Sequence, residues 1–302
     1  MKIAFLFNGQ GNQYVGMGSD LYNNNDYAKD LYDKFSDIKE LSFNQNELIN
    51  ETKYAQPITL LYGYIYSKIL EQNGIIPEYV CGLSLGEYSA LAFSDTWDIN
   101  SAIDIIKYRG DIMQNALPLG TTKMAAVIGL DKDKVLEAIK TTKGICEIAN
   151  YNCPGQIVIS GDIIGVDSVK EKLTELGALK IVDLNVSGAF HSSFLKPASL
   201  KLRKKLDEYK PNKPKYKVVY NVSGKEENSN INEILERQIC NSVYFEDTLR
   251  YLIDNGVDTF VEIGPGKSLS GFLKRIDRKK VCYSVSDYES LIKTIDGLKN
   301  HD

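Results

Sequence analysis

The segment Gly82-Leu-Ser-Leu-Gly86 constrains the fold more than any other part of the sequence. It fits the pattern G-x-S-x-G, with an apolar strand-like stretch directly before it and a helical pattern starting at Leu85. A sharp strand-to-helix turn crowds the backbone at both flanks, so a residue without a Cβ atom is favoured there. Such a turn would lift the Ser84 hydroxyl clear of a sheet and would aim the Leu85 amide, at the positive end of a helix, where an oxyanion would form. The alternative is a tight turn that merely contains a serine.

Apolar strand-like runs alternate with helical patterns along most of the chain, which predicts an α/β fold with a mainly parallel sheet. Strands are expected at 2–7, 216–221 and 258–263, and a helix at 26–39. Over 122–187 the order becomes strand, helix, strand, strand, helix, strand, which is the ferredoxin-like unit. We therefore expect a larger, α/β-hydrolase-like subdomain (1–121 and 188–302) and a small ferredoxin-like subdomain inserted at 122–187.

A second glycine-containing loop, Gly9-Gln-Gly11, ends the first strand. In a parallel sheet it would lie at the same carboxyl edge as Ser84, where open α/β sheets place their ligands, and it could supply a second amide to an oxyanion hole. A dinucleotide-binding loop is excluded, because the third glycine of G-x-G-x-x-G would fall on Tyr14.

Composition and charge exclude several classes of function. The 302 residues include 36 basic and 40 acidic side chains, and a net charge of −4 disfavours general nucleic-acid affinity. The five cysteines are scattered without a C-x-x-C pair, which argues against a disulfide framework and a zinc site. No stretch approaches the roughly 18 apolar residues of a membrane span, and the opening segment is not a signal peptide, so we expect a soluble cytoplasmic protein.

The chain contains only two histidines, and His301 is the penultimate residue, where chain ends usually fray. If an imidazole acts as a base, it is therefore His191, in the loop at the exit of the small subdomain. An α/β-hydrolase would place its histidine late, behind an acid on a strand end, whereas about 110 residues follow His191 here. The chain order thus differs from that fold.

Arg109 lies in the middle of an expected helix, among apolar neighbours that draw one face inwards. A buried arginine needs a partner, so it either pairs with a protein carboxylate or awaits an anionic substrate. Spacing alone favours the pair with a carboxylate.

With these motifs in place, the chain resembles the malonyl-CoA:acyl-carrier-protein transacylases, the acyltransferases of fatty-acid and polyketide synthesis. The similarity runs nearly end to end, and the order and spacing of its motifs are specific. The motifs are Gly9-Gln-Gly-Asn-Gln13, Gly82-Leu-Ser-Leu-Gly-Glu-Tyr88, Arg109-Gly-Asp-Ile-Met-Gln114, Asn152-Cys-Pro-Gly-Gln156, Val158-Ile-Ser-Gly161, Gly188-Ala-Phe-His191 and Glu262-Ile-Gly-Pro-Gly266.

The resemblance implies a ping-pong reaction without a cofactor. Ser84 would attack the malonyl thioester of coenzyme A, His191 would serve as general base and acid, and the backbone carbonyl of Gln238 would orient the imidazole. The amides of Gln10 and Leu85 would form the oxyanion hole. Arg109 would bind the free malonyl carboxylate through two parallel hydrogen bonds, and Phe190 matches the malonyl-type pattern, because a bulky ring would crowd a branched α-carbon.

Three positions depart from the family pattern: Leu83 replaces the usual His, and Asn8 and Ser242 each replace a Pro. Acyl carrier protein, the partner that the resemblance implies, is typically acidic, so recognition needs local positive charge. The candidate docking segments are Lys201–Lys217, with eight basic residues against two acids, and Lys274–Lys280. For any single lysine, a solvated surface position is the simpler interpretation.

Three other functions stay open at this point. An acyl hydrolase or a trans-acting polyketide acyltransferase of the same fold would use the same nucleophile. A non-catalytic module that binds carrier protein would need neither Ser84 nor His191.

Overall fold

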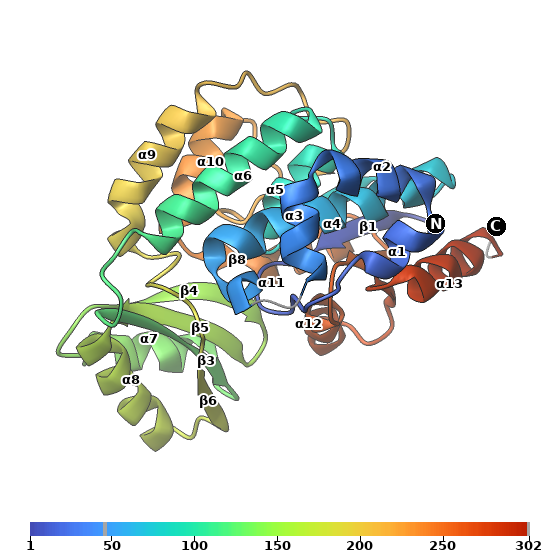
Figure 1. Ribbon diagram of the computed structural model, residues 1–302. Helices are drawn as coiled ribbons and strands as arrows, with labels where there is room; N and C mark the ends of the chain where they lie inside the picture. The colour runs from blue at the N-terminus through green and yellow to red at the C-terminus, as the bar shows by residue number, and fades with distance from the viewer. Residues whose placement is uncertain (45–46, 301–302) are drawn as a thin grey trace.

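A computed structural model describes residues 1–44 and 47–300, and His301 lies outside the described residues. Its chain forms two lobes, each built on one five-stranded sheet (Figure 1). The strands of the larger lobe are β1 (Ile3–Phe7), β2 (Tyr79–Gly82), β7 (Lys217–Val218), β9 (Thr259–Ile263) and β10 (Val281–Val285). Its helices are α1 (Ser19–Asn24), α2 (Asp26–Lys34), α3 (Ser36–Phe43), η1 (Glu47–Asn50), α4 (Thr52–Gln72), α5 (Leu85–Phe93), α6 (Ile99–Gln114), η2 (Ser193–Leu195), α9 (Lys196–Leu206), α10 (Ile231–Cys240), α11 (Phe245–Asp254), α12 (Ser268–Ile276) and α13 (Tyr288–Lys299).

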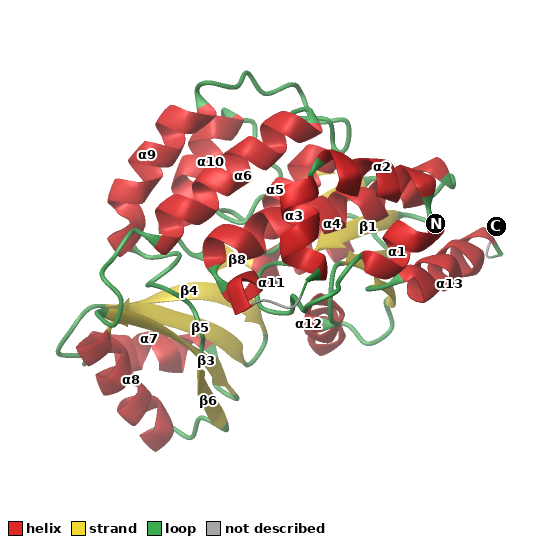
Figure 2. Cartoon of the chain, viewed as in Figure 1, coloured by secondary structure: helices red, strands yellow, loops and turns green. Residues whose placement is uncertain are grey.

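The sheet of the larger lobe has the order β10-β9-β1-β2-β7, and all of its strand pairs are parallel. Helices cover it (Figure 2), and β1 is fully buried at its centre. Successive β1 side chains enter different apolar clusters: Phe5 and Phe7 pack with Phe93 of α5, whereas Leu6 joins the cluster of α11 and α12. Burial on both faces explains why this strand reads as a continuous apolar run.

The smaller lobe consists of β3 (Thr122–Ile128), α7 (Lys132–Lys140), β4 (Cys146–Cys153), β5 (Gln156–Asp162), α8 (Ile163–Glu175) and β6 (Lys180–Asp183). Its sheet order, β6-β3-β5-β4-β8, confirms the predicted ferredoxin-like arrangement, and α7 and α8 lie on one side of it (Figure 2). The fifth strand, β8 (Val243–Tyr244), comes from beyond 122–187 and pairs in parallel with β4. One short segment of the later chain therefore joins the two lobes.

Two sequence predictions were wrong in detail. The helix expected over 26–39 is two helices, because Phe35 adopts a non-helical conformation (φ −107°, ψ 57°) between α2 and α3. The strand expected over 216–221 shortens to β7, because beyond it Tyr220 pairs with Lys225 across the turn at Gly224 instead of continuing along β2. Local turn chemistry overrides the apolar pattern in both places.

Within the described ranges, none of the helices combines the length and the apolar character that a membrane crossing requires.

The turn between β2 and α5 fits against β1 only because both of its flanking residues are glycines. A Cβ atom on Gly86 would overlap the carbonyl oxygen of Phe7, and one on Gly82 would overlap the backbone of Gly86. The register Phe7↔Gly82 places the ends of β1 and β2 side by side. The loop after β1 is thereby brought next to Ser84.

We expect Gly86→Ala to lower the free energy of unfolding by about 3 kcal/mol, because the added methyl group meets rigid backbone and must separate β1 from α5. The measurement is urea unfolding followed by circular dichroism. Gly271→Ala is the matched control: its Cβ atom would meet nothing within 4 Å, and alanine favours the α12 helix, so its midpoint should be unchanged or slightly higher. Equal midpoints for the two variants would contradict this packing.

Candidate active site

Ser84 occupies the turn between β2 and α5 with φ 54° and ψ −104°, a conformation that is costly for a residue with a Cβ atom. Among the described residues other than glycine, only Asp95 and His191 also have positive φ. Two of these three strained residues therefore meet in one site. Such strain persists where the surrounding structure enforces it, and it is concentrated at functional sites.

A chain of hydrogen bonds links Ser84, His191 and Gln238. The Ser84 Oγ lies 2.7 Å from the His191 Nε2, and the His191 Nδ1 lies 2.9 Å from the Gln238 carbonyl oxygen. Because a carbonyl oxygen can only accept, Nδ1 carries the proton and Nε2 is free to accept the serine proton. The structure thus brings together the three residues that the sequence and the resemblance single out.

The imidazole of His191 is held neutral. Burial, followed by the nearby positive charge of Arg109, lowers the pKa of His191 from 6.5 to about 4. His191 is only 4% exposed, and its hydrogen bond to Gln238 opposes this shift without cancelling it. A neutral imidazole is the form that can take a proton from a hydroxyl.

Arg109, on α6, is completely buried, and no carboxylate of the described residues is hydrogen-bonded to it. Its Nη1 donates to the Gln56 Oε1 at 2.7 Å, and its Nη2 donates to the Gln238 Oε1 at 3.0 Å and to the Ser84 Oγ at 3.1 Å. Its guanidinium also lies 4.9 Å from the centre of the Tyr88 ring.

From spacing alone, the sequence favoured an ion pair between Arg109 and a protein carboxylate. This prediction was wrong, since no ion pair between described residues includes Arg109. The nearby Glu87 does not neutralise it, because burial raises the pKa of Glu87 to about 8 and keeps its carboxyl mostly protonated near neutral pH. A desolvated positive charge remains beside the Ser84 hydroxyl, an arrangement suited to an anionic ligand.

The amides of Gln10 and Leu85 belong to segments on opposite sides of Ser84. Leu85 is the first residue of α5, where amides point out of the helix unpaired. Gln10 follows β1, and a Cβ atom on the neighbouring Gly9 would lie 2.7 Å from the Leu83 carbonyl oxygen, so glycine permits the close approach of the two loops. Within residues 1–44 and 47–300, neither amide donates to another protein group.

A cavity of about 440 Å³ opens over Ser84 between the two lobes. Gln10, Leu85, Phe190 and His191 line it together with Ser84. The smaller lobe contributes side chains from β3, β4 and β5, and α12 contributes Ser268, Leu269 and Phe272. The cavity therefore gives a ligand access to Ser84, while His191 and Arg109 stay buried.

The three departures from the family pattern each have a place in this site or beside it. Leu83 lines the cavity. Asn8 is buried and donates from its Nδ2 to the Pro265 carbonyl oxygen at 2.9 Å. Ser242 donates to the Ile148 carbonyl oxygen at 2.5 Å, which ties the segment before β8 to β4.

Sequence reasoning missed the side chains that hold the site together: Gln56, the amide of Gln238, and the buried pair Asn221 and Glu87. Gln56 could have been noticed, because it is a polar residue at the start of an apolar helical pattern. The side chain of Gln238 donates from Nε2 to the Ser84 carbonyl oxygen at 2.8 Å, a contact that spacing cannot reveal.

In the described part of the chain, no group of three or more His, Cys, Asp or Glu side chains could hold a metal ion.

Comparison with known proteins places this geometry in a family. Residues 4–289 match the family model described as acyl transferase domain. The chain is 38% identical, over its whole length and 98% of the relative, to a malonyl CoA-acyl carrier protein transacylase of Bacillus subtilis. A crystal structure of malonyl CoA-acyl carrier protein transacylase from Clostridium perfringens superposes with a TM-score of 0.96 at 39% identity, covering 100% of this chain and 98% of the other.

A malonyl-transacylase solved in complex with a type II PKS acyl-carrier protein has a TM-score of 0.94 at 33% identity, covering 98% of this chain and 100% of that one. The family model spans nearly the whole chain, and both lobes are shared with these structures. The chain belongs to the acyl transferase domain family.

Proposed function

We propose that this chain transfers a malonyl group from malonyl-CoA to the phosphopantetheine thiol of an acyl carrier protein, through a malonyl-Ser84 intermediate. One observation carries the proposal: the Ser84 Oγ contacts both a neutral imidazole and a buried guanidinium that forms no ion pair with a described residue. The first activates a nucleophile, and the second selects an acyl group with a free carboxylate. The names of the similar proteins, one of them solved with a carrier protein, support the same reaction.

In the first half-reaction the Ser84 oxygen attacks the thioester carbonyl while His191 accepts the hydroxyl proton. The amides of Gln10 and Leu85 stabilise the oxyanion, a contribution of roughly 3–4 kcal/mol for each such donor in acyl-transfer enzymes. As the C–S bond breaks, the imidazolium returns its proton to the coenzyme A sulfur. The second half-reaction repeats these steps with the carrier thiol as nucleophile and Ser84 as leaving group, so no cofactor is required.

Arg109 would bind the malonyl carboxylate, with the amide oxygens of Gln56 and Gln238 holding the guanidinium in place. Arginine presents parallel N–H donors that match a planar carboxylate, and burial strengthens the attraction. Phe190, only 6% exposed beside His191, would leave little room for a branched α-carbon. Arg109 thus favours acyl groups that carry a free carboxylate, and among these Phe190 favours malonyl over methylmalonyl.

We propose that the chain consists of a large catalytic subdomain, 1–121 and 188–302, and a small inserted subdomain, 122–187, as its sequence predicts. The residues with chemical roles then all lie in 1–121 and 188–302, and the inserted segment contributes the opposite wall of the cavity through Met124, Asn150 and Asn152.

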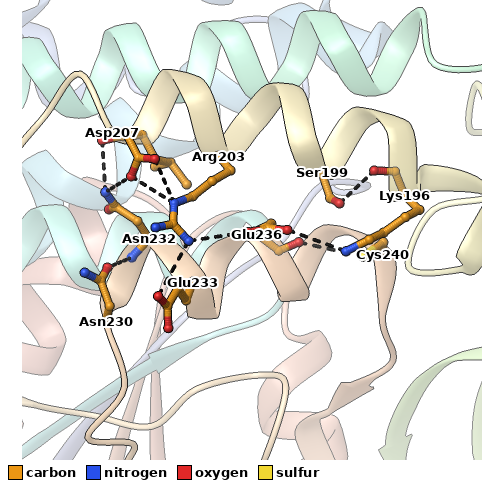
Figure 3. Close-up of polar contacts among 10 residues, drawn as sticks. Lys196, Ser199, Arg203, Asp207, Asn230, Asn232, Glu233, Glu236 and Cys240 are labelled. Atoms are coloured by element: carbon orange, nitrogen blue, oxygen red, sulfur yellow. Dashed lines mark hydrogen bonds and ion pairs between the residues drawn. The ribbon is translucent and has the colours of Figure 1, made fainter.

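The two basic segments differ in how free their charges are. In Lys201–Lys217, half of the basic residues already have acidic partners: Arg203 with Asp207, Lys205 with Asp104, Lys215 with Glu71 and Lys217 with Glu78. Figure 3 shows that Arg203 also faces Glu233 and Glu236 of α10. No residue of α9 lines the cavity.

The segment Lys274–Lys280 has the better position for docking. α12 begins at the cavity wall and ends in this segment; it is nine residues long, about 13 Å at 1.5 Å per residue. Lys274, Arg275, Arg278 and Lys279 are exposed, and none of them forms an ion pair with another described residue. We propose that an acidic carrier protein docks here.

Mass spectrometry after incubation with malonyl-CoA tests the proposed function. We expect a malonyl adduct on Ser84, absent in Ser84→Ala, that transfers to a holo carrier protein. An adduct that water removes as fast as it forms would favour the hydrolase, and no adduct would favour a binding module.

We expect Arg109→Ala to slow malonyl transfer about 100-fold, because charge-assisted hydrogen bonds contribute roughly 1.5–3 kcal/mol each. Acetyl transfer, which has no carboxylate to bind, should fall less than tenfold. Steady-state rates with malonyl-CoA and acetyl-CoA provide the measurement, and equal losses for both substrates would refute the assignment of Arg109.

Charge reversal tests the docking surface. Lys274→Glu combined with Lys279→Glu should raise the KM for the carrier protein about tenfold and leave malonyl loading of Ser84 unchanged. The matched control combines Lys201→Glu with Lys204→Glu on α9, which should change neither quantity. If the α9 pair of substitutions raised the KM for the carrier protein more than the Lys274 and Lys279 pair, the docking site would instead be Lys201–Lys217.

A further inference from the structure

Besides the bond that its carbonyl oxygen accepts from the Glu87 amide of α5 at 3.1 Å, the backbone of Ser84 is held by two hydrogen bonds from side chains. Its amide donates to the Asn221 Oδ1 at 2.7 Å, and its carbonyl oxygen accepts from the Gln238 Nε2 at 2.8 Å. Both polar groups of the strained peptide are therefore fixed by side chains from distant segments.

Asn221 lies just beyond β7, is completely buried, and uses all of its polar groups. Besides accepting from Ser84, its Nδ2 donates to the Gly82 carbonyl oxygen at 2.7 Å. Its own amide donates to the Glu87 Oε2 at 2.6 Å, and its carbonyl oxygen accepts from the Tyr244 amide at 2.8 Å. One asparagine thus bridges the last residue of β2, the nucleophile, α5 and β8.

Ser84 has a lower-energy alternative that these bonds prevent. It is the N-cap residue of α5, and a serine there usually adopts extended backbone angles and turns its hydroxyl back to cap the helix amides. Here φ is 54° and the Ser84 side chain makes no capping bond. The hydroxyl points to His191 instead, 2.7 Å away.

We infer that Asn221 is a positioning residue: it holds the Ser84 peptide in its strained conformation and keeps the hydroxyl from capping α5. Glu87 anchors it, because Glu87 is buried on the first turn of α5 and binds the Asn221 amide. The inference rests on the proposed role of Ser84 as nucleophile. Asn221 touches neither the reacting atoms nor the cavity, so it acts through Ser84 alone.

The test is the reactivity of Ser84 in Asn221→Ala. We expect the rate of malonyl loading at saturating malonyl-CoA to fall about 100-fold, since small misplacements of a reacting group have effects of this size, with the KM for malonyl-CoA within threefold of wild type. Phenylmethylsulfonyl fluoride is a second probe that needs neither coenzyme A binding nor Arg109. The Ser84 oxygen displaces fluoride from sulfur as His191 takes the hydroxyl proton, and this labelling should slow by a similar factor.

Asn232→Ala is the matched control. Asn232 is also a buried asparagine of the larger lobe, and its Nδ2 donates to the Leu206 carbonyl oxygen at 3.1 Å and to Asp207, the latter contact drawn in Figure 3. Its loss should lower the unfolding midpoint and leave both rates within threefold of wild type. If Asn232→Ala slowed loading as much as Asn221→Ala, general destabilisation would explain both variants and the inference would fail.

Glu87 supplies a test that does not depend on whether Asn221→Ala folds. Glu87→Ala should slow sulfonyl fluoride labelling about tenfold, and Glu87→Gln, whose amide oxygen can still accept from the Asn221 amide, should restore most of the rate. Labelling at the wild-type rate in Asn221→Ala or Glu87→Ala would overturn the inference. If wild-type protein is labelled by the sulfonyl fluoride but forms no malonyl adduct, the proposed function fails while this inference is still tested.

Discussion

A positive charge that no described residue neutralises, buried against the Ser84 hydroxyl, is the constraint on which the site depends. An isolated ion in a protein interior costs several kcal/mol after relaxation, so Arg109 must be surrounded by acceptors. The protein supplies neutral ones, namely two glutamine oxygens, the serine hydroxyl and an aromatic face. Neutral partners leave the positive charge free to attract an anionic ligand, whereas a protein carboxylate would have neutralised it.

Together with burial, which is the larger cause, this charge also sets the protonation of the neighbouring His191. It helps to hold His191 neutral, and because a guanidinium can only donate, the Ser84 oxygen must accept from Arg109 and donate its own proton to Nε2. Gln238 links all three residues, through its carbonyl oxygen to the imidazole and through its side chain to Arg109 and the Ser84 peptide. In the proposed reaction, the direction of proton transfer is therefore set before any substrate binds.

The sequence was sufficient for what depends on local pattern. The turn at Ser84, the ferredoxin-like order over 122–187 and the parallel sheet all follow from periodicity and glycine placement, and the structure confirms them. The partners of Arg109 could not be predicted, because Gln56 and Gln238 lie far away in the chain and a glutamine in a helix carries no signal of what it binds. The predictions of one helix over 26–39 and of a longer strand over 216–221 failed for a related reason. Tertiary packing and turn geometry determine the break at Phe35 and the short β7, and neither leaves a periodic pattern in the sequence.

The three departures from the family pattern change local contacts but leave the hydrogen bonds that link Ser84, His191 and Gln238 in place. Where proline is usual, Asn8 and Ser242 each donate a side-chain hydrogen bond to a backbone carbonyl, which ties neighbouring segments together. Leu83 acts differently, because an aliphatic side chain beside the nucleophile offers no second titratable group. Among the described residues His191 is then the single imidazole. In the proposed reaction, a proton taken from Ser84 has no second imidazole among the described residues to pass to, so it stays on Nε2 until it returns to the leaving sulfur.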